Sequence, residues 1–521
     1  MIGGALYREA LRALQRLQLP EAATRDVTLA LEAALPGPIP VLWSAGQEAG
    51  LSPEALLARG SGLFIAFAAG NLADDLCDGD CTLWPDPERH APYVQYLLQN
   101  LALSELVRGG LGAGALGRMG QELARGAGPQ ALEVRTREWT PALYREVAEG
   151  IAGRQWAAYF TALYDGTGQE TTAAQRGLAL GIAAHTAEDR SSGDLRFYTL
   201  SSEGRADICA WAAAYAERLG DDPAGWVQRL ITPLLEQLRA PEDAPTDTTA
   251  VRAYYEAKTE SILRRYGPGP RVHFHTGLVD RSQPLDVERS TLSARIREGQ
   301  EALLEHLSGI LGQHGHAPGR LLDVGCGLGG GSLFWASRGA QVTAITHAEG
   351  HVPRVMDFAR QEGLADRIEV RLCDALEDPG GGPFDTVFAC ESSCYFPRAA
   401  WMQHVAGLLR PGGRLLIADG FLGHASQRIP FDRYWRTRIG TRDEYFEAAR
   451  NAGLLLEVDE DLAERAADFW DVTLALLEHE RRDAVGGARE RLRASRREHR
   501  RHRDGLRDGS LGYGVLLFRR P

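Results

Sequence analysis

Residues 318–331 read PGRLLDVGCGLGGG, an apolar run that ends near Asp323 and leads directly into Gly325, Gly327 and Gly329. Glycine lets the backbone turn sharply and lets a ligand approach the main chain closely. The stretch therefore predicts a β-strand, a tight turn and the start of a helix, with a ligand lying against the turn. A glycine run of this kind is weak evidence for a nucleotide by itself, so the neighbouring sequence has to be considered with it.

Strand-like and helix-like segments alternate from residue 318 onward. Apolar runs typical of strands are separated by amphipathic segments in most places. This alternation predicts an α/β Rossmann-like domain, with a largely parallel sheet and helices on both faces. Ligands of such sheets bind at the carboxyl ends of the strands. The strand-like runs are RLLDV, AQVTAIT, RIEVRL, FDTVFAC, RLLIAD, LLLEV and GYGVLLFR, and the last helix-like segment is a long one at 461–505.

Polar residues and a glycine turn follow the predicted strands in a characteristic order. Thr346 and His347 end the second strand, Cys373-Asp374-Ala375 follows the third, and Glu391 follows the fourth. LLRPGGRLLIAD (408–419) then adds a turn and a further strand. This order resembles the class I S-adenosylmethionine-dependent methyltransferases, over roughly residues 250–521. A dinucleotide-dependent oxidoreductase, the alternative, explains neither the residues after the third strand nor the 408–419 stretch.

The resemblance implies S-adenosylmethionine as cofactor. Its methionine and ribose parts would pack over the glycine turn, Asp323 would face its amino-acid end through water, and Asp374 would accept from the adenine amino group. The full set of implied cofactor-binding residues is Asp323, Gly325, Cys326, Gly327, Gly329, Thr346, His347, Asp374 and Ala375. One position departs from the family, in which an acid at the end of the second strand usually binds both ribose hydroxyls. Thr346-His347 stands there instead, as in a subgroup of C-methyltransferases, and this leaves the ribose contacts open.

Two further stretches concern the methyl acceptor. YYEAKTESILRRYGPGPRVHFHTG (254–277) gathers aromatic and histidine residues, and CESSCYF (390–396) follows the fourth strand. Both resemble the geranyl diphosphate, tocopherol and related small-molecule C-methyltransferases, with their E-S-x-x-x-(Y/H) pattern. The resemblance implies methylation of the alkene of a prenyl diphosphate, of geranyl or farnesyl type, in terpenoid natural-product biosynthesis.

Methylation of an alkene leaves a carbocation, which aromatic faces stabilise and a base quenches by removing a proton, either directly or after cyclisation. We predict Glu391 as this base, with Tyr255 and His275 as further catalytic residues; a ligand role toward cofactor or metal is the alternative for Glu391. The aromatic residues expected around the cation are Tyr255, Phe274, Tyr395, Tyr434 and Trp435, for which ordinary core packing is the alternative. The side chains available for a diphosphate are Arg265, Arg271, His273, His275, Arg433 and Arg438.

Residues 1–240 have a different pattern. They are rich in Ala, Leu, Glu and Arg, with apolar residues three and four apart, which predicts an all-α domain. A Pro-, Thr- and acid-rich stretch at 241–250 predicts a linker to the second domain, 251–521. Within NLADDLCDGD (71–80), Asp74 and Asp78 share one face of a helix, next to Asp75. Grouped carboxylates of this kind suit Mg²⁺ that bridges to phosphate.

A second acidic stretch, EDRSSGD (188–194), ends a later apolar helix. The layout of the two acidic stretches resembles the isoprenoid synthase fold, in which two acidic helices hold a diphosphate through Mg²⁺. The resemblance implies Asp74, Asp75, Asp78 and Asp189 as metal ligands. The second stretch departs from the patterns of terpene cyclases, and the basic motifs of chain-elongating enzymes are missing from the sequence. An acidic, solvated helix end and a degenerate scaffold therefore stay open as alternatives.

Composition limits the class of protein. The 521 residues, 44% hydrophobic and 25% charged, are typical of a soluble globular protein of two or three domains. A net charge of −12 argues against nucleic acid as partner; the arginine-dense stretch 481–507 is the exception, and a solvated helix face is its simpler interpretation. No uninterrupted apolar run of about 18 residues predicts an integral membrane segment. The seven cysteines form no paired CxxC, which fits reduced thiols in the cytoplasm.

These observations together predict a two-domain enzyme. The C-terminal domain would methylate a small isoprenoid, and the helical domain would bind or process its diphosphate or serve as a scaffold. We expect a homo-oligomer. The alternative is a methyltransferase of another small natural product, with an indole, quinol or hydroxyl acceptor, joined to a non-catalytic helical dimerisation domain.

Overall fold

The computed structural model describes residues 4–35, 37–77, 81, 83–84, 86–133, 138–219, 225–240, 248–280, 282–482 and 487–521. The chain divides into two compact units, Met1–Glu242 and Asp243–Pro521, each with its own hydrophobic core. Residues 241–247 of the predicted linker lie outside the described residues, and residues 248–250 form the first turn of the helix that opens the second unit.

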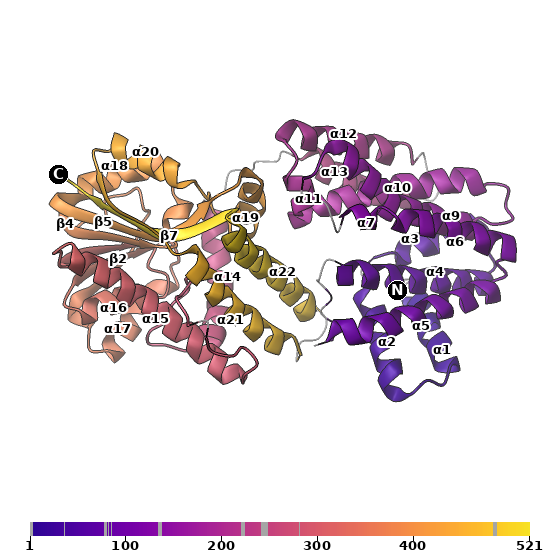
Figure 1. The fold of residues 1–521 in the computed structure, drawn as a ribbon, viewed down its shortest axis with the longest axis horizontal. Helices are drawn as coiled ribbons and strands as arrows, with labels where there is room; N and C mark the ends of the chain where they lie inside the picture. The colour runs from indigo at the N-terminus through magenta and orange to yellow at the C-terminus, as the bar shows by residue number, and fades with distance from the viewer. Residues whose placement is uncertain are drawn as a thin grey trace. The chain divides into compact units, whose positions relative to one another are not determined.

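The described part of the first unit is built from helices, without a strand (Figure 1). Their apolar faces converge on one core that includes Leu63, Phe64 and Phe160, as the spacing of three and four predicts. The helices are α1 (Gly4–Arg16), α2 (Glu21–Ala33), α3 (Ile39–Glu48), α4 (Pro53–Cys77), α5 (Pro87–Arg108), α6 (Ala113–Ala127), α7 (Gln130–Glu133), α8 (Pro141–Ala148), the π-helical η1 (Glu149–Arg154), α9 (Gln155–Leu163), α10 (Glu170–Ser192), α11 (Leu195–Tyr198), α12 (Ser202–Glu217) and α13 (Trp226–Arg239). The helical prediction is confirmed, whereas the isoprenoid-synthase-like arrangement stays a prediction.

Helix α4 is the central helix of this unit. Among the described helices it is the one with the length and apolar composition to cross a membrane, but 67% of its apolar window is buried inside the unit. It packs closely against α5 at Gly62. A Cβ on Gly62 would lie only 2.9 Å from the Leu106 side chain and 3.1 Å from the Ala102 carbonyl oxygen. The apolar character of α4 therefore fits a core helix.

The second unit is an α/β fold around a seven-stranded sheet. The strand order is β3-β2-β1-β4-β5-β7-β6; β1 to β5 pair in parallel, and β7 runs antiparallel to β5 and β6. The strands are β1 (Arg320–Val324), β2 (Gln341–Thr346), β3 (Ile368–Leu372), β4 (Phe384–Cys390), β5 (Leu409–Leu422), β6 (Leu455–Asp461) and β7 (Leu511–Arg519). The seven apolar runs of the sequence thus correspond to these seven strands, and the Rossmann-like prediction is confirmed.

Helices cover both faces of this sheet (Figure 1). One face packs against α15, α16 and α21, and the other against α18 and α20. The helical elements of this unit are α14 (Thr248–Tyr266), α15 (Arg289–Gln313), α16 (Gly330–Ser337), α17 (His351–Gln361), η2 (Ala365–Arg367), η3 (Ser393–Tyr395), α18 (Arg398–Leu408), η4 (Ala425–Gln427), α19 (Arg428–Trp435), α20 (Arg442–Asn451), α21 (Ala463–Arg482) and α22 (Gly487–Asp508). Because both faces are buried, the central strands are continuously apolar.

Two segments differ from their sequence prediction. The turn expected in 408–419 lies inside β5. The pairing register between β4 and β5 shifts between Phe384 and Thr386, and this irregularity accommodates the proline and the glycines of the stretch. The single helix expected at 461–505 is two helices, α21 and α22, which pack against each other.

The arginine-dense stretch lies mostly on α22. Its arginines form ion pairs with acids of α21: Arg503 Nη1 lies 3.2 Å from Asp471 Oδ1, Arg507 Nη2 lies 2.5 Å from Asp471 Oδ2, and Arg496 Nε lies 3.6 Å from Glu478. These contacts give the three arginines a role within the fold.

Candidate functional site

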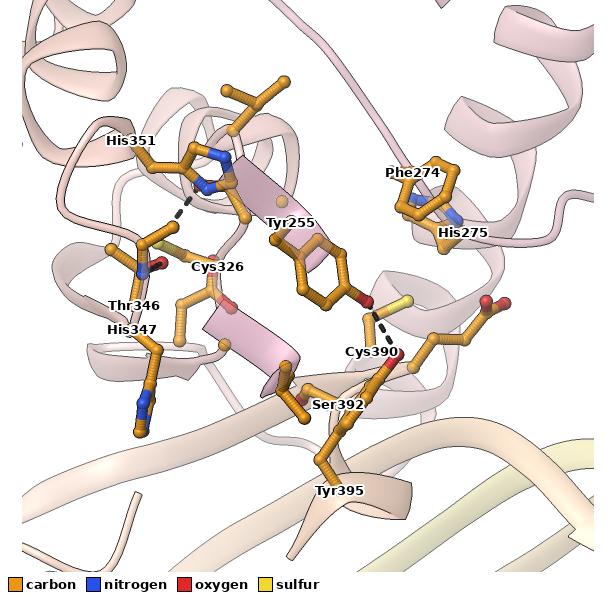
Figure 2. A pocket seen from close by; sticks show the side chains of 18 of the residues that line it. Tyr255, Phe274, His275, Cys326, Thr346, His347, His351, Cys390, Ser392 and Tyr395 are labelled. Carbon is orange, nitrogen blue, oxygen red and sulfur yellow. Dashed lines mark hydrogen bonds between the residues drawn. The ribbon is translucent and has the colours of Figure 1, made fainter. Parts of the chain in front are cut away.

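A cavity of about 310 Å³ lies at the carboxyl ends of β1, β2 and β4 in the second unit (Figure 2). Small-molecule sites have volumes of about 300–1,000 Å³. The strand ends and the glycine turn supply part of the wall, and α14 and the segment 272–275 supply another part. Further lining residues are Leu304 of α15, His351 of α17 and Arg438. The sequence-predicted residues that line the cavity are Tyr255, His273, Phe274, His275, Asp323, Gly325, Cys326, Gly327, Thr346, His347, Asp374, Glu391, Tyr395 and Arg438.

The glycine turn forbids side chains for two different reasons. Gly325 has a φ of +78°, and a Cβ on it would lie 2.6 Å from Ser392 Cβ, so the end of β4 occupies that space. Gly327 has a φ of +54° and lines the cavity, and a Cβ on it would meet no atom within 4 Å. The space at Gly327 is therefore open for a ligand. Gly329 caps α16 and packs against Val355, outside the cavity lining.

Asp323 lies near the end of β1, beneath this turn, and is 3% exposed. Ser332 Oγ, from the first turn of α16, donates to Asp323 Oδ2 at 2.5 Å. Burial raises the pKa of the Asp323 carboxyl to about 6, and the Ser332 hydrogen bond opposes that rise. The cavity thus has an acidic acceptor at the position predicted to face the amino-acid end of the cofactor.

The residues after β2 and β3 meet at another edge of the cavity. His347 Nε2 lies 3.1 Å from Asp374 Oδ2, and the Leu376 N–H donates to Asp374 Oδ1 at 2.8 Å. The Ala348 N–H donates to Thr346 Oγ1 at 3.2 Å, which shapes the turn after β2. Asp374 is therefore held in place at the edge where the adenine amino group is expected. Ala375 is buried in the core and does not line the cavity.

Glu391 directly follows β4 and has a φ of +48°, which turns its side chain away from the strand direction. The Thr276 N–H donates to Glu391 Oε1 at 2.6 Å, and the Glu391 N–H donates to the Ala418 carbonyl at 2.8 Å. Burial, together with the charge of Asp419, raises the pKa of the Glu391 carboxyl to about 7. A carboxyl with a pKa near neutrality is suited to general base chemistry at physiological pH.

Aromatic rings line the same cavity as Glu391. Figure 2 shows Tyr255 projecting from α14 with its hydroxyl toward Tyr395, and the two hydroxyl oxygens are 2.8 Å apart. Phe274 packs edge-on against Tyr255, with ring centroids 6.2 Å apart. Tyr434 and Trp435 do not line the cavity, but the Trp435 carbonyl accepts from the Tyr395 hydroxyl at 3.1 Å. Three of the five predicted aromatic residues therefore lie around the proposed reaction space.

His275 lies in the same wall, beside Phe274 (Figure 2). Its Nδ1–H donates to the Thr276 carbonyl at 2.7 Å, and burial lowers its pKa to about 3. The ring is therefore neutral at physiological pH. Among the predicted arginines, Arg438 lines the cavity, whereas Arg265 pairs with Glu480 and Arg271 lies 3.6 Å from Glu301. Arg433 does not line the cavity.

The lining residues that were not predicted include Arg252, Ser392 and His351. Arg252 precedes Tyr255 by three positions, so helical spacing would have placed both on one face. Ser392 Oγ donates to the Val324 carbonyl at 2.6 Å and fixes the turn after β4. Its position next to Glu391 in the sequence could have indicated that it lies at the cavity. No pattern in the sequence marks His351.

The acidic stretches of the first unit show partial convergence. Gln130 Nε2 donates to Asp74 Oδ1 at 3.0 Å, and the Cys81 N–H donates to the Asp75 carbonyl at 2.7 Å. Asp189 is 1% exposed, and the Tyr144 hydroxyl donates to it at 2.8 Å. Asp78 lies outside the described residues.

Burial raises the pKa of the Asp189 carboxyl well above its ordinary value, and the charges of Asp194, Glu188 and Asp74 add to the rise. The acids of α4 and α10 thus act on each other electrostatically, although their stretches are far apart in the sequence. Ligand-type atoms of His185, Glu188 and Asp189 lie within 4.8 Å of one another, so a second acid and a histidine accompany Asp189.

Comparison with known proteins agrees with the fold and the glycine turn. Residues 321–413 match the methyltransferase domain family. The chain is 32% identical over 241 residues to 27-O-demethylrifamycin SV methyltransferase from Amycolatopsis mediterranei (strain S699), a match that covers 44% of this chain and 86% of that protein. It is 31% identical over 220 residues to the chloroplastic tocopherol O-methyltransferase of Arabidopsis thaliana, covering 39% of this chain and 63% of that protein.

The chain is also similar to solved methyltransferase structures. Geranyl diphosphate C-methyltransferase from Streptomyces coelicolor A3(2), in complex with Mg²⁺, geranyl-S-thiolodiphosphate and S-adenosyl-L-homocysteine, is 21% identical, with a TM-score of 0.45 and coverage of 54% of this chain and 100% of that chain. With its glycine turn, its strand order and these sequence matches, the chain belongs to the class I S-adenosylmethionine-dependent methyltransferases through its C-terminal half.

Proposed function

We propose that the chain methylates the alkene carbon of a prenyl diphosphate. The observation that carries this proposal is the placement of Glu391, a partly buried side chain whose carboxyl has a pKa of about 7, in the wall of a cavity that also holds Tyr255, Phe274 and Tyr395. An alkene acceptor needs aromatic faces for its cation and a base for its proton, and both lie around one space. The CESSCYF sequence at the end of β4 supports the same chemistry.

S-adenosylmethionine, when bound over the glycine turn, supplies an electrophilic methyl group. The π electrons of the acceptor alkene form the new carbon–carbon bond, the electrons of the methyl–sulfur bond stay on sulfur, and a carbocation is left on the acceptor. The aromatic rings would stabilise that cation and exclude water from it, and Tyr255 would be held in place by its hydrogen bond to Tyr395. Glu391 would take the proton from the neighbouring carbon and restore the alkene.

Two arginines support a phosphorylated acceptor. Arg252 lies on α14 one turn before Tyr255, and Arg438 donates its backbone N–H to the carbonyl of Cys394, the neighbour of Tyr395. Both side chains line the cavity. Both arginines would bind the diphosphate of the acceptor.

Incubation with methyl-labelled S-adenosylmethionine and geranyl or farnesyl diphosphate tests the proposal. After phosphatase treatment, labelled methylated alcohols should enter the organic phase, and the label should be on carbon by mass spectrometry and NMR. Geraniol and farnesol, which lack the diphosphate, are the matched controls and should be poor acceptors. Turnover of the alcohols equal to that of the diphosphates, or no transfer to either, would contradict the proposal.

Oxygen methylation of another small natural product is the second candidate. It is favoured by the two curated relatives above, of which one is by name an O-methyltransferase and the other a 27-O-demethylrifamycin SV methyltransferase. Glu391 would then deprotonate a hydroxyl group or a quinol, and no cation would need stabilisation. A labelled methoxy product from a panel of quinols and hydroxylated acceptors, without transfer to prenyl diphosphates, would select this candidate.

For the helical unit we propose a role with the same substrate class. Asp189, with Glu188, His185 and Asp74 nearby, offers oxygen and nitrogen ligands that suit a divalent cation bridging to a diphosphate. Mg²⁺ with inorganic diphosphate should raise the melting temperature of the full chain, and Asp189→Asn should abolish that increase. If the melting temperature increased equally in the wild-type chain and in Asp189→Asn, the result would favour a scaffold role for the helical unit. A cytoplasmic location and a homo-oligomeric state also stay predictions.

A further inference from the structure

Helix α5 of the first unit is apolar on two of its faces. One face packs into the core of the unit, against α4. The large apolar side chains that are exposed on the other face are Tyr93 (38%), Tyr96 (68%), Leu103 (50%) and Val107 (58%). Single exposed apolar residues are common on a protein surface, whereas a row of them along one helix marks an interaction surface.

The exposed residues of this face follow a regular spacing. Successive members are separated by four, three, four, three and four positions, and all of them are exposed. An alternation of three and four is the spacing of a coiled-coil seam, in which side chains of one helix fit between those of another. The residues of this α5 seam are Arg89, Tyr93, Tyr96, Asn100, Leu103 and Val107.

The α5 seam is complementary to itself when two copies run antiparallel. A two-fold axis midway between Tyr96 and Asn100 makes every seam residue face a different seam residue of the second copy. The pairs across the two copies are then Arg89 with Val107, Tyr93 with Leu103, and Tyr96 with Asn100. Each pair joins a long side chain to a shorter one, which favours close packing. A parallel pair would instead bring each residue against itself, including two Arg89 side chains.

The polar groups of the seam also match in the antiparallel arrangement. Asn100 Nδ2 donates to the Tyr96 carbonyl of its own helix at 2.8 Å. The amide oxygen of Asn100 is thereby left to accept from the Tyr96 hydroxyl of the second copy.

Arg89 gives the seam its charge complementarity. It forms no ion pair among the described residues, and it stands in the first turn of α5, where the helix dipole repels a cation. In the antiparallel pair, Arg89 lies at the carboxyl end of the second copy's α5, where the helix dipole attracts a cation. The same contact forms twice, once at each end of the pair.

The charge of the chain favours this surface for contact between copies. The net charge is −12, so two copies repel each other over most of their surfaces. The α5 seam contains no acidic residue, and its one charged side chain is the cation Arg89. Two copies can therefore approach each other along α5 without bringing like carboxylates together.

We propose that two copies of the chain form an antiparallel dimer through the α5 seam. The dimer gives a surface and a direction to the homo-oligomer that the sequence predicts. It depends on the helical unit alone, so it is independent of the methyl acceptor, and prenyl diphosphate methylation can fail or succeed without affecting it.

Sedimentation velocity of the full chain over a range of concentrations tests the interface. The wild-type chain should sediment as a dimer. Leu103→Glu should raise the dissociation constant by roughly tenfold or more, because the substitution acts twice in a two-fold interface. Leu132→Glu is the matched control: it changes a leucine of α7 that is 41% exposed and lies outside the seam, and it should leave the dissociation constant unchanged. Tyr96→Glu is a second disruptive variant, should Leu103→Glu fail to fold.

Disulfide crosslinking tests the direction of the pair. Oxidation of a mixture of Arg89→Cys and Val107→Cys chains should give a covalent dimer above the background of the native cysteines. Either variant alone should stay at that background, because two copies of the same position lie about 27 Å apart along the helices.

Four results would overturn the dimer. They are a wild-type chain that stays monomeric at the highest attainable concentration, a dimer that neither Leu103→Glu nor Tyr96→Glu weakens, an equal weakening by Leu132→Glu, and crosslinking of Val107→Cys alone that matches the mixture.

Discussion

The hydroxyl oxygens of Tyr255 and Tyr395 lie 2.8 Å apart, between two residues separated by 140 positions in the sequence. Since the Tyr395 hydroxyl donates its proton to the Trp435 carbonyl, the Tyr255 hydroxyl is the donor of the pair. This hydrogen bond holds α14 against the segment that follows β4, at the carboxyl ends of the central strands. Both rings line the cavity that also holds Glu391, the base that we propose.

Removal of the Tyr255 ring should slow methylation more than removal of its hydroxyl. Tyr255→Leu deletes a cation-stabilising face and should lower kcat by roughly 3- to 30-fold. Tyr255→Phe keeps the face and loses one hydrogen bond, so kcat should stay within roughly threefold of wild type. Tyr434→Leu removes a ring outside the cavity lining and is the matched control. Equal losses in the Leu and Phe variants would speak against cation stabilisation by this ring.

The rate of methylation should depend on pH through Glu391. Only the deprotonated carboxylate accepts a proton, and its pKa is raised to about 7 by burial. The rate should therefore fall as pH decreases below 7 and level off above about pH 8. Glu391→Gln should lower kcat by roughly 10²- to 10⁴-fold while S-adenosylhomocysteine still binds in calorimetry. If Glu391→Gln kept its activity and its pH profile were the same as that of the wild type, Glu391 would not be the base that accepts the proton.

The same carboxyl should influence stability in the opposite sense from a salt-bridged acid. Its pKa rises from the ordinary value of 4.5 to about 7 on folding, so the folded chain binds the proton more tightly than the unfolded chain. The group therefore reduces stability as pH rises from about 4.5 to 7, by up to roughly 3 kcal/mol.

Glu391→Gln removes this pH-dependent cost and can still accept from the Thr276 N–H. The variant should gain melting temperature relative to wild type at pH 8, and the gain should be smaller at pH 5. Differential scanning calorimetry at the two pH values measures this difference. A gain that is larger at pH 5 would show that the ionised carboxylate is favoured by the fold.

Alanine at the two glycines of the turn should have different effects. Gly325→Ala would force a Cβ to within 2.6 Å of Ser392 Cβ at a φ of +78°, so it should lower stability by roughly 2 kcal/mol or more. Gly327→Ala meets no protein atom within 4 Å and should cost roughly 1 kcal/mol, from its φ of +54°. Binding of S-adenosylhomocysteine should nevertheless weaken in Gly327→Ala, because the new methyl group enters space that the ligand needs. Thermal melts and calorimetric titrations compare the two, and an unaffected affinity in Gly327→Ala would place the ligand elsewhere.

The sequence by itself determined the local features of the second unit. Seven apolar runs became seven strands because each run is long enough for one strand, and the central strands are buried on both faces. The residues at the strand ends, such as Asp323, His347, Asp374 and Glu391, were found at the cavity because parallel strands bring their carboxyl ends to one edge. The helical character of the first unit followed equally from spacing.

Only the tertiary structure decided which of these residues meet and in which protonation state. Ala375 and Gly329 have the expected sequence positions, but packing turns them into the protein core and away from the cavity. Arg252 and His351 come to the cavity from helices whose orientation no local pattern specifies. The pKa of Glu391, the neutral ring of His275 and the pairing of Tyr255 with Tyr395 arise from burial and from contacts between distant segments. Burial of this kind is a property of the packed chain, because desolvation depends on every neighbour that excludes water from the group.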